Sequence, residues 1–155
     1  MRKISTILFA LFCVLSMSAK TFYLKPNSNW TQGNAWFAAY YFDNSTSKNG
    51  WVKMTAVAND PGVYTAEIDD KYPTVIFCRM NPAKSALSWD SKWDQTVDLT
   101  VKGKAENCCA INDGQWNNAN VTWSTYTPPT TIPDYYLTGT GNLVGGGGWS
   151  AKEIK

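Results

Sequence analysis

The sequence predicts an all-β domain, and two observations carry that prediction. Between residues 21 and 126, short runs of apolar or alternating residues are separated by segments rich in Asn, Asp, Gly, Ser and Pro, the residues that form turns. No segment shows a capped helical stripe of about ten or more residues. Strands spaced about 8 to 12 residues apart, each with one apolar face, are typical of an antiparallel sandwich or barrel of about 100 residues.

Each expected strand is a short run bounded by turn formers. The first run, TFYLK, has three aromatic or aliphatic residues between two polar ones and ends at Pro26. AWFAAYYF and TVIFCRM are almost continuously apolar, whereas WVKMTAV, GVYTAEI and TVDLTV alternate. NCCAI is a short apolar run, and NVTWSTY alternates again. The expected strands are therefore residues 21–25, 35–42, 51–57, 62–68, 74–80, 96–101, 107–111 and 120–126.

Residues 1–19 have the three parts of a signal peptide for export. A basic start, RK, is followed by the apolar run ILFALFCVL and then by small residues before Lys20. Cleavage after Ser18 places the small residue Ser16 at the minus-three position, so we expect it in preference to cleavage after Ala19. The sequence therefore predicts a protein that is secreted or displayed at the cell surface.

Charge and hydropathy exclude two classes of partner. Loss of Arg2 and Lys3 with the signal lowers the 14 basic residues to 12, equal to the 12 acidic residues, so the mature chain is formally neutral. A neutral chain is a poor partner for nucleic acid or for an anionic membrane. No stretch after the signal approaches the roughly 20 apolar residues that cross a bilayer. We expect neither a nucleic-acid partner nor a membrane span.

The C-terminal part is expected to lie outside the first domain. Residues 127–134, TPPTTIPD, contain three prolines and form an extended linker after a β-domain that spans residues 20–126. Residues 135–155 are too few to bury a core, so we interpret them as the truncated start of a second module. The alternative is that they add a strand to the first domain. The glycines at 145–148 lack the flanking residues of a phosphate-binding loop.

The residue types present leave little catalytic chemistry. The chain has no histidine, which excludes a Ser/His/Asp triad, a Cys/His nucleophile pair and His-ligated metals. Most carboxylates stand in turn segments, where Asp stabilises the turn. Asp90, Asp94 and Asp98 recur every four residues but lack the alternating ligands and the glycine of a calcium loop. We therefore expect no catalytic residues, no metal and no cofactor.

Three cysteines, Cys78, Cys108 and Cys109, remain after removal of the signal. An odd number excludes a full disulfide framework. One pair could bridge neighbouring strands, and the alternative is three buried free thiols.

Aromatic residues make up 14% of the chain, with 8 Trp, 8 Tyr and 6 Phe, which is more than a core of this size needs. An exposed indole suits a neutral, hydroxyl-rich ligand, because the apolar C–H face of a pyranose stacks on the ring while polar side chains bond the hydroxyls. Three tryptophans in polar segments are equally compatible with the surface and the core: Trp30, Trp36 and Trp89. Four others are expected in the core: Trp51, Trp93, Trp116 and Trp123.

Six stretches between residues 21 and 126 carry a family resemblance: TFYLKPNSNWTQGNAWFAAYYF, WVKMTAV, GVYTAEI, YPTVIFCRMNP, SWDSKWDQTVDLTV and INDGQWNNANVTWSTY. Together they resemble the small starch-binding β-sandwich modules, similar to carbohydrate-binding families 25 and 26, of secreted or surface proteins from Bacteroides-type gut bacteria. The most specific pieces are VIFCRMNP and WDSKWDQTVDL. The resemblance implies an immunoglobulin-like antiparallel β-sandwich with a shallow site where two or three aromatic rings cradle an α-glucan. The adjacent Cys108 and Cys109 depart from the pattern.

The resemblance also implies a set of binding residues. Tyr23 and Trp36 match the stacking aromatic residues best by position, and Trp30 is the candidate third ring. Three residues in and after the VIFCRMNP strand complete the expected carbohydrate-binding set: Arg79, Trp89 and Lys92.

The expected function is non-catalytic binding of a starch-like α-glucan polysaccharide or oligosaccharide by aromatic stacking and polar hydrogen bonds. Two alternatives stay open. The chain could be an accessory module of a longer secreted, amylase-like glycoside hydrolase, or a surface adhesion domain whose exposed rings pack on a protein partner. The tail from residue 135 resembles the start of another glycan-binding module, so further modules of the same longer protein are expected.

Overall fold

A computed structural model describes residues 18–130 of the chain. Residues 1–17 of the expected export signal lie outside the described part of the chain. So do residues 131–155, which include the end of the expected linker and the whole expected second module. The first strand begins at Ala19, and Ser18 is already bonded to Asp70 through its hydroxyl at 2.7 Å. Cleavage after Ser18, the expected position, would remove this bond but would leave every residue of the first strand in the chain.

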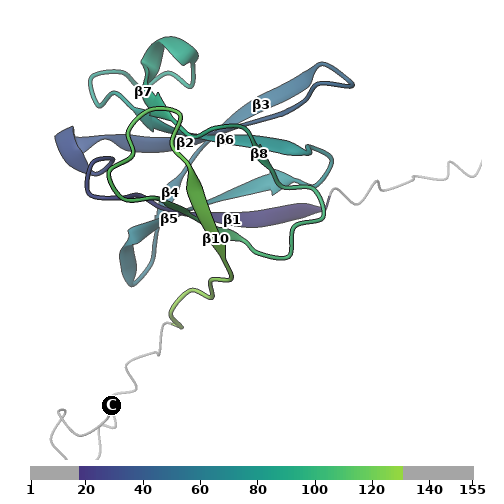
Figure 1. Ribbon diagram of the computed structural model, residues 1–155. Coiled ribbons are helices and arrows are strands. Elements are labelled where there is room, and N and C mark those ends of the chain that lie inside the picture. Colours follow the sequence, from purple (N-terminus) through teal and green to yellow (C-terminus); the bar gives the residue numbers. More distant parts are fainter. Residues whose placement is uncertain (1–17, 131–155) are drawn as a thin grey trace, which may run out of the picture.

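The described residues form two β-sheets packed face to face, shown as two layers in Figure 1. The first sheet has the strand order β10-β9-β1-β5-β4, and the second has the order β3-β2-β6-β7, with β8 also paired to β6. Two short 3₁₀ turns, η1 (Gln32–Asn34) and η2 (Trp89–Ser91), lie in the loops. The strands are β1 (Ala19–Lys25), β2 (Trp36–Asp43), β3 (Lys48–Lys53), β4 (Thr55–Val57), β5 (Asp60–Asp69), β6 (Thr74–Met80), β7 (Lys92–Gln95), β8 (Leu99–Thr100), β9 (Cys108–Ile111) and β10 (Val121–Ser124).

The predicted all-β sandwich is confirmed. All strand pairs are antiparallel except β1 with β9, which run parallel with Tyr23 opposite Cys108. Because β1 pairs with β5 on its other side, this parallel pairing brings β9, and with it β10, onto β1.

The expected strand WVKMTAV is in fact two strands in two different sheets. Its first part belongs to β3, which pairs with β2, and its last part forms β4, which pairs with β5. The buried residue Met54 lies between them, and its backbone N–H donates to the carbonyl of Phe37. The run therefore crosses the edge of the sandwich, which an alternating pattern alone does not reveal.

The core lies between the sheets and is built from alternate residues of the central strands. Phe37, Ala39 and Phe77 face inward from the second sheet, and Phe22 and Leu24 face them from the first. The intervening residues of β2 and β6 face outward and form a separate cluster. This alternation follows from the two-residue period of a strand.

The three cysteines lie in three different places, so the expected alternative of free thiols is the one found. Cys109 belongs to the core between the sheets, and its neighbour Cys108 faces the opposite side of the same strand. Cys78 lies in the outward cluster of the second sheet. All three are free and fully buried, so no disulfide forms among the described residues.

Burial should make these thiols inert in the folded protein. Burial raises the pKa of Cys78 to about 12 and raises those of Cys108 and Cys109. Because the thiolate is the reactive form, a maleimide reagent at neutral pH should label them slowly in the native state and fully in denaturant. Peptide mass spectrometry after timed labelling measures this. Rapid labelling of native Cys108 would contradict the packing described here.

The last residue of the folded part, Tyr126, is held by several contacts. Its backbone forms two hydrogen bonds with the Asn107 side chain, at 2.8 and 3.0 Å, and its hydroxyl donates to Asp60 at 2.8 Å. Burial and the Asp60 carboxylate raise the pKa of this phenol to about 12. These contacts anchor the end of the sandwich before the prolines begin at position 128.

Candidate functional site

The outward face of the second sheet carries a continuous group of aromatic rings. Along β2, the outward positions are Trp36, Ala38, Tyr40 and Phe42, and β3 adds Trp51 opposite Tyr40. Ala38 is fully buried, whereas the four rings are partly exposed. The Tyr40 ring lies 4.9 Å from that of Trp51 and 5.5 Å from that of Phe42, measured between centroids.

A fifth aromatic residue reaches this face from a loop. The segment after β6 folds back so that the carbonyls of Asn81 and Lys84 both accept from the indole N–H of Trp36 at 3.0 Å. Farther along the same loop, the Trp89 ring lies 4.7 Å from the rings of both Tyr40 and Trp51. Trp89 is 42% exposed. We call Trp36, Tyr40, Phe42, Trp51 and Trp89 the outer aromatic platform.

Polar groups border the platform. The Lys92 ammonium lies 5.7 Å from the Trp89 ring and donates to the Gln95 side-chain oxygen at 2.6 Å. On the other side, the Lys53 ammonium lies 5.1 Å from the Trp36 ring. The platform therefore offers apolar ring surface beside groups that can bond hydroxyls.

A second aromatic arrangement surrounds Arg79 at one end of the sandwich. The Arg79 guanidinium carbon lies 4.6 Å from the Trp93 ring and 5.3 Å from the Trp116 ring. Arg79 itself is buried, at 6% exposed, whereas the two indoles are 40% and 42% exposed. We call these three residues the Trp–Arg–Trp group.

Buried hydrogen bonds fix the Trp–Arg–Trp group in place. The guanidinium donates to the carbonyls of Trp30 and Gln32, at 2.9 and 2.7 Å, and forms a 2.9 Å ion pair with Asp94. The indole N–H of Trp30 donates to the carbonyl of Trp116 at 2.9 Å.

Asn27 and Gly33 complete this end of the fold. The Asn27 amide donates to the carbonyls of Asn112 and Gln115, tying the loop before Trp116 to the loop after β1. Figure 1 shows these two loops on the same side of the sandwich. Gly33 has a φ of 68°, and a Cβ there would lie 3.3 Å from the Trp93 ring. Glycine is therefore needed here for both its backbone conformation and its small size.

The six predicted binding residues do not form one site. Trp36, Trp89 and Lys92 lie together at the outer aromatic platform. Arg79 lies at the Trp–Arg–Trp group instead. The remaining two rings offer no free face: Trp30 is 0% exposed in the main core, and Tyr23 is 8% exposed against Tyr126 on the far side of the first sheet. Trp30 therefore has a structural role and is not a stacking ring for a ligand. Its ring packs on that of Phe37, and its indole N–H donates to the backbone carbonyl of Trp116.

Five aromatic residues of these two arrangements were absent from the predicted set: Tyr40, Phe42, Trp51, Trp93 and Trp116. The expectation that Trp93 and Trp116 lie in the core is wrong, because both are exposed. A signal for Trp116 was present in the run of polar residues around it, INDGQWNNAN. For Tyr40 it was the alternation along β2, which puts every second ring on one face.

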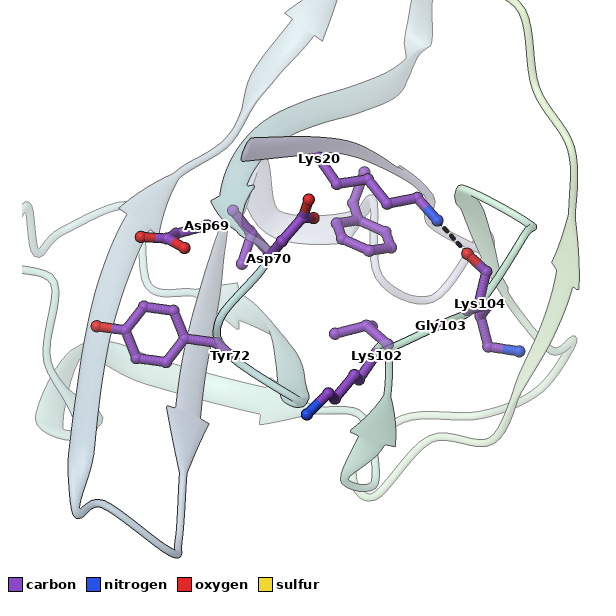
Figure 2. Close-up of a pocket in the computed structure, with 10 residues that line it drawn as sticks. Lys20, Asp69, Asp70, Tyr72, Lys102, Gly103 and Lys104 are labelled. Carbon is purple, nitrogen blue, oxygen red and sulfur yellow. Dashed lines mark hydrogen bonds between the residues drawn. The ribbon is translucent and has the colours of Figure 1, made fainter. Parts of the chain in front are cut away.

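Among the cavities, the one drawn in Figure 2 is separate from both aromatic arrangements. It has a volume of about 380 Å³. In Figure 2, Lys20 extends across the cavity toward the Lys104 backbone, to whose carbonyl it donates. None of the six predicted binding residues lines it, and its charged residues Asp69 and Asp70 are bonded to Lys71 and Ser18.

Residues 18–130 contain no group of three or more acidic or cysteine residues placed to hold a metal ion. None of the helical turns in this part of the chain is long and apolar enough to cross a membrane. Comparison with known proteins finds no matching family model, no matching curated protein and no matching solved structure.

Proposed function

We propose that this protein binds α-glucan polysaccharide without catalysis, on the outer aromatic platform. The observation that carries the proposal is the contact among three partly exposed rings, Tyr40, Trp51 and Trp89, on one sheet face. Stacking on such rings removes water from the C–H faces of sugars, and Lys92 and Gln95 stand beside them to bond hydroxyls.

The orientation of the rings favours a curved chain over a flat one. The Trp89 ring is inclined by 64° to that of Tyr40 and by 68° to that of Trp51, and the Tyr40 and Trp51 rings are inclined by 51° to each other, so no two of the three rings share a plane. Successive sugars of an α-linked glucan turn relative to one another, whereas a flat β-linked chain would require nearly coplanar rings. Starch-like polymers therefore match this geometry better than cellulose does.

The rest of the chain is compatible with a surface role. The neutral charge of the mature sequence suits an uncharged polymer, and the N-terminal segment has the pattern of an export signal. We infer that the domain acts outside the cytoplasm, secreted or at the cell surface.

The proposal is tested by Trp89→Ala. A single shallow site should hold oligosaccharides with a dissociation constant of roughly 10 µM to 1 mM. Loss of the Trp89 ring should weaken binding of maltoheptaose about tenfold or more, about 1.4 kcal/mol or above, because a central aromatic contact disappears. Isothermal titration measures the affinity, and affinity electrophoresis in gels containing soluble starch, cellulose or mucin glycans measures selectivity.

Leu87→Ala is the matched control. Leu87 lies in the same loop and is 39% exposed, close to the exposure of Trp89, but it is not aromatic and belongs to neither ring group. It should bind as the parent does. If none of the three polysaccharides retards the parent protein, the glycan proposal fails and the rings are better explained as a contact surface for a protein partner.

A further inference from the structure

We propose that the Trp–Arg–Trp group is a second α-glucan site, so that one domain holds a polymer at two places. The inference rests on the proposed function for the class of ligand, but its evidence is a different set of residues. Trp93 lies in β7 and Trp116 in the loop between β9 and β10, and neither belongs to the outer aromatic platform.

The first step of the argument is that two large indoles are kept at the surface by buried bonds. Exposing apolar ring surface to water opposes folding, although a single exposed tryptophan is common enough to need no explanation. Here, however, a buried arginine lies within 5.3 Å of both rings, and the N–H of a fully buried tryptophan holds the backbone of one of them. A preorganised pair loses little conformational entropy when a ligand binds.

The second step concerns the charge of the ligand. The Arg79 guanidinium could suggest an anionic ligand, but it is paired with Asp94 at 2.9 Å and also donates to two backbone carbonyls. Its charge is therefore already compensated. What remains available at the surface is indole, with the exposed side chains of Gln32 in η1 and of Asn117 next to Trp116. This combination suits a neutral ligand with apolar faces and many hydroxyls.

The third step is the placement of the two sites relative to β7. In β6, Arg79 faces inward at the end of the sandwich while Cys78 and Met80 on either side of it face the outer cluster. Trp89 of η2 and Lys92 of β7 lie at the outer aromatic platform. Trp93, the next residue of β7, belongs to the Trp–Arg–Trp group. The two sites thus adjoin along one short segment. Two weak sites on one rigid domain raise the apparent affinity for a polymer through effective concentration.

The experiment is a titration of the full-length, ¹⁵N-labelled protein with maltoheptaose, observed through the indole N–H signals in NMR spectra. Single Trp→Phe variants assign the signals. We expect two sets of saturable shifts, one at Trp51 and Trp89 and one at Trp93 and Trp116. Trp116→Ala should weaken the second set of shifts about tenfold while leaving the first within about twofold. Asp113→Ala, at an exposed position of the same loop that is not part of the proposed site, is the control and should change neither set.

The outcomes separate the two proposals. If Trp89→Ala abolishes the first set and the second persists with unchanged affinity, the second site is established as independent. If maltoheptaose shifts Trp51 and Trp89 but leaves Trp93 and Trp116 unmoved, the second site is overturned and the proposed function stands. If only Trp93 and Trp116 respond, the second site stands and the platform proposal fails. If neither set moves, both fail.

Discussion

Replacing Arg79 with Met should lower the free energy of unfolding by about 3 kcal/mol. The substitution leaves Asp94 without its ion-pair partner and leaves the carbonyls of Trp30 and Gln32 without a donor. Both charged side chains are largely buried, at 8% and 15% exposed, so water replaces the lost bonds only in part. For a domain of about this size, such a loss lowers the melting temperature by roughly 10 to 20 °C, which calorimetry measures.

The double substitution Arg79→Met with Asp94→Leu is the informative companion. It removes the buried carboxylate together with the guanidinium, so no charge is left without a partner. Replacing both members of a buried ion pair with apolar residues is often close to neutral. We therefore expect the double variant to be more stable than Arg79→Met alone. If the two variants melt at the same temperature, the ion pair is not what makes Arg79 important, and its carbonyl bonds or its packing between the rings account for the loss.

Truncating Trp30 to Ala should be at least as destabilising, at about 3 to 5 kcal/mol. Its indole is fully buried and lies parallel to the Phe37 ring, at 7° and 6.3 Å between centroids. Loss of the side chain leaves a cavity beside Phe37, and the carbonyl of Trp116 loses its donor. Denaturant unfolding of the variant and the parent measures the difference, with an unchanged slope as the sign that only stability has altered.

Trp30→Phe separates packing from positioning. Phenylalanine keeps most of the ring volume but cannot donate to the Trp116 carbonyl. We expect a smaller loss of about 1 to 2 kcal/mol, together with weaker maltoheptaose binding at the Trp–Arg–Trp group and unchanged binding at the outer aromatic platform. If Trp30 only stabilises the fold, Trp30→Phe should lower the free energy of unfolding but leave the ratio of the maltoheptaose binding constants at the two sites unchanged.

Strand positions were predictable because they depend on local patterns. The runs TFYLK, AWFAAYYF and TVIFCRM appear as β1, β2 and β6 with shifts of at most two residues at each end. β7 was missed, since its four residues lie in a segment read as a polar loop, and WVKMTAV was read as one strand. The pairing of β3 with β2 and of β4 with β5 decides that division, and it involves residues remote in sequence.

The binding surface was only partly predictable. Trp36, Trp89 and Lys92 were identified from position and resemblance, and they do lie together. Trp30 was named as a candidate binding ring and Trp93 was expected in the core, whereas in the fold Trp30 is buried and Trp93 is exposed. Both stand in polar segments, so local composition does not distinguish them. The distinction arises because the loop containing Trp116 closes over Trp30 through hydrogen bonds to residues about 85 positions away.

The sequence by itself determined the all-β class, the lack of histidine chemistry, the near balance of acidic and basic residues and the surplus of rings, because each follows from composition or from a two-residue period. Only the tertiary structure decided which rings meet water, that the three described thiols lie apart and where Arg79 points. Those outcomes depend on which element covers each face of a strand, and the alternation of side chains is the same whichever face is covered.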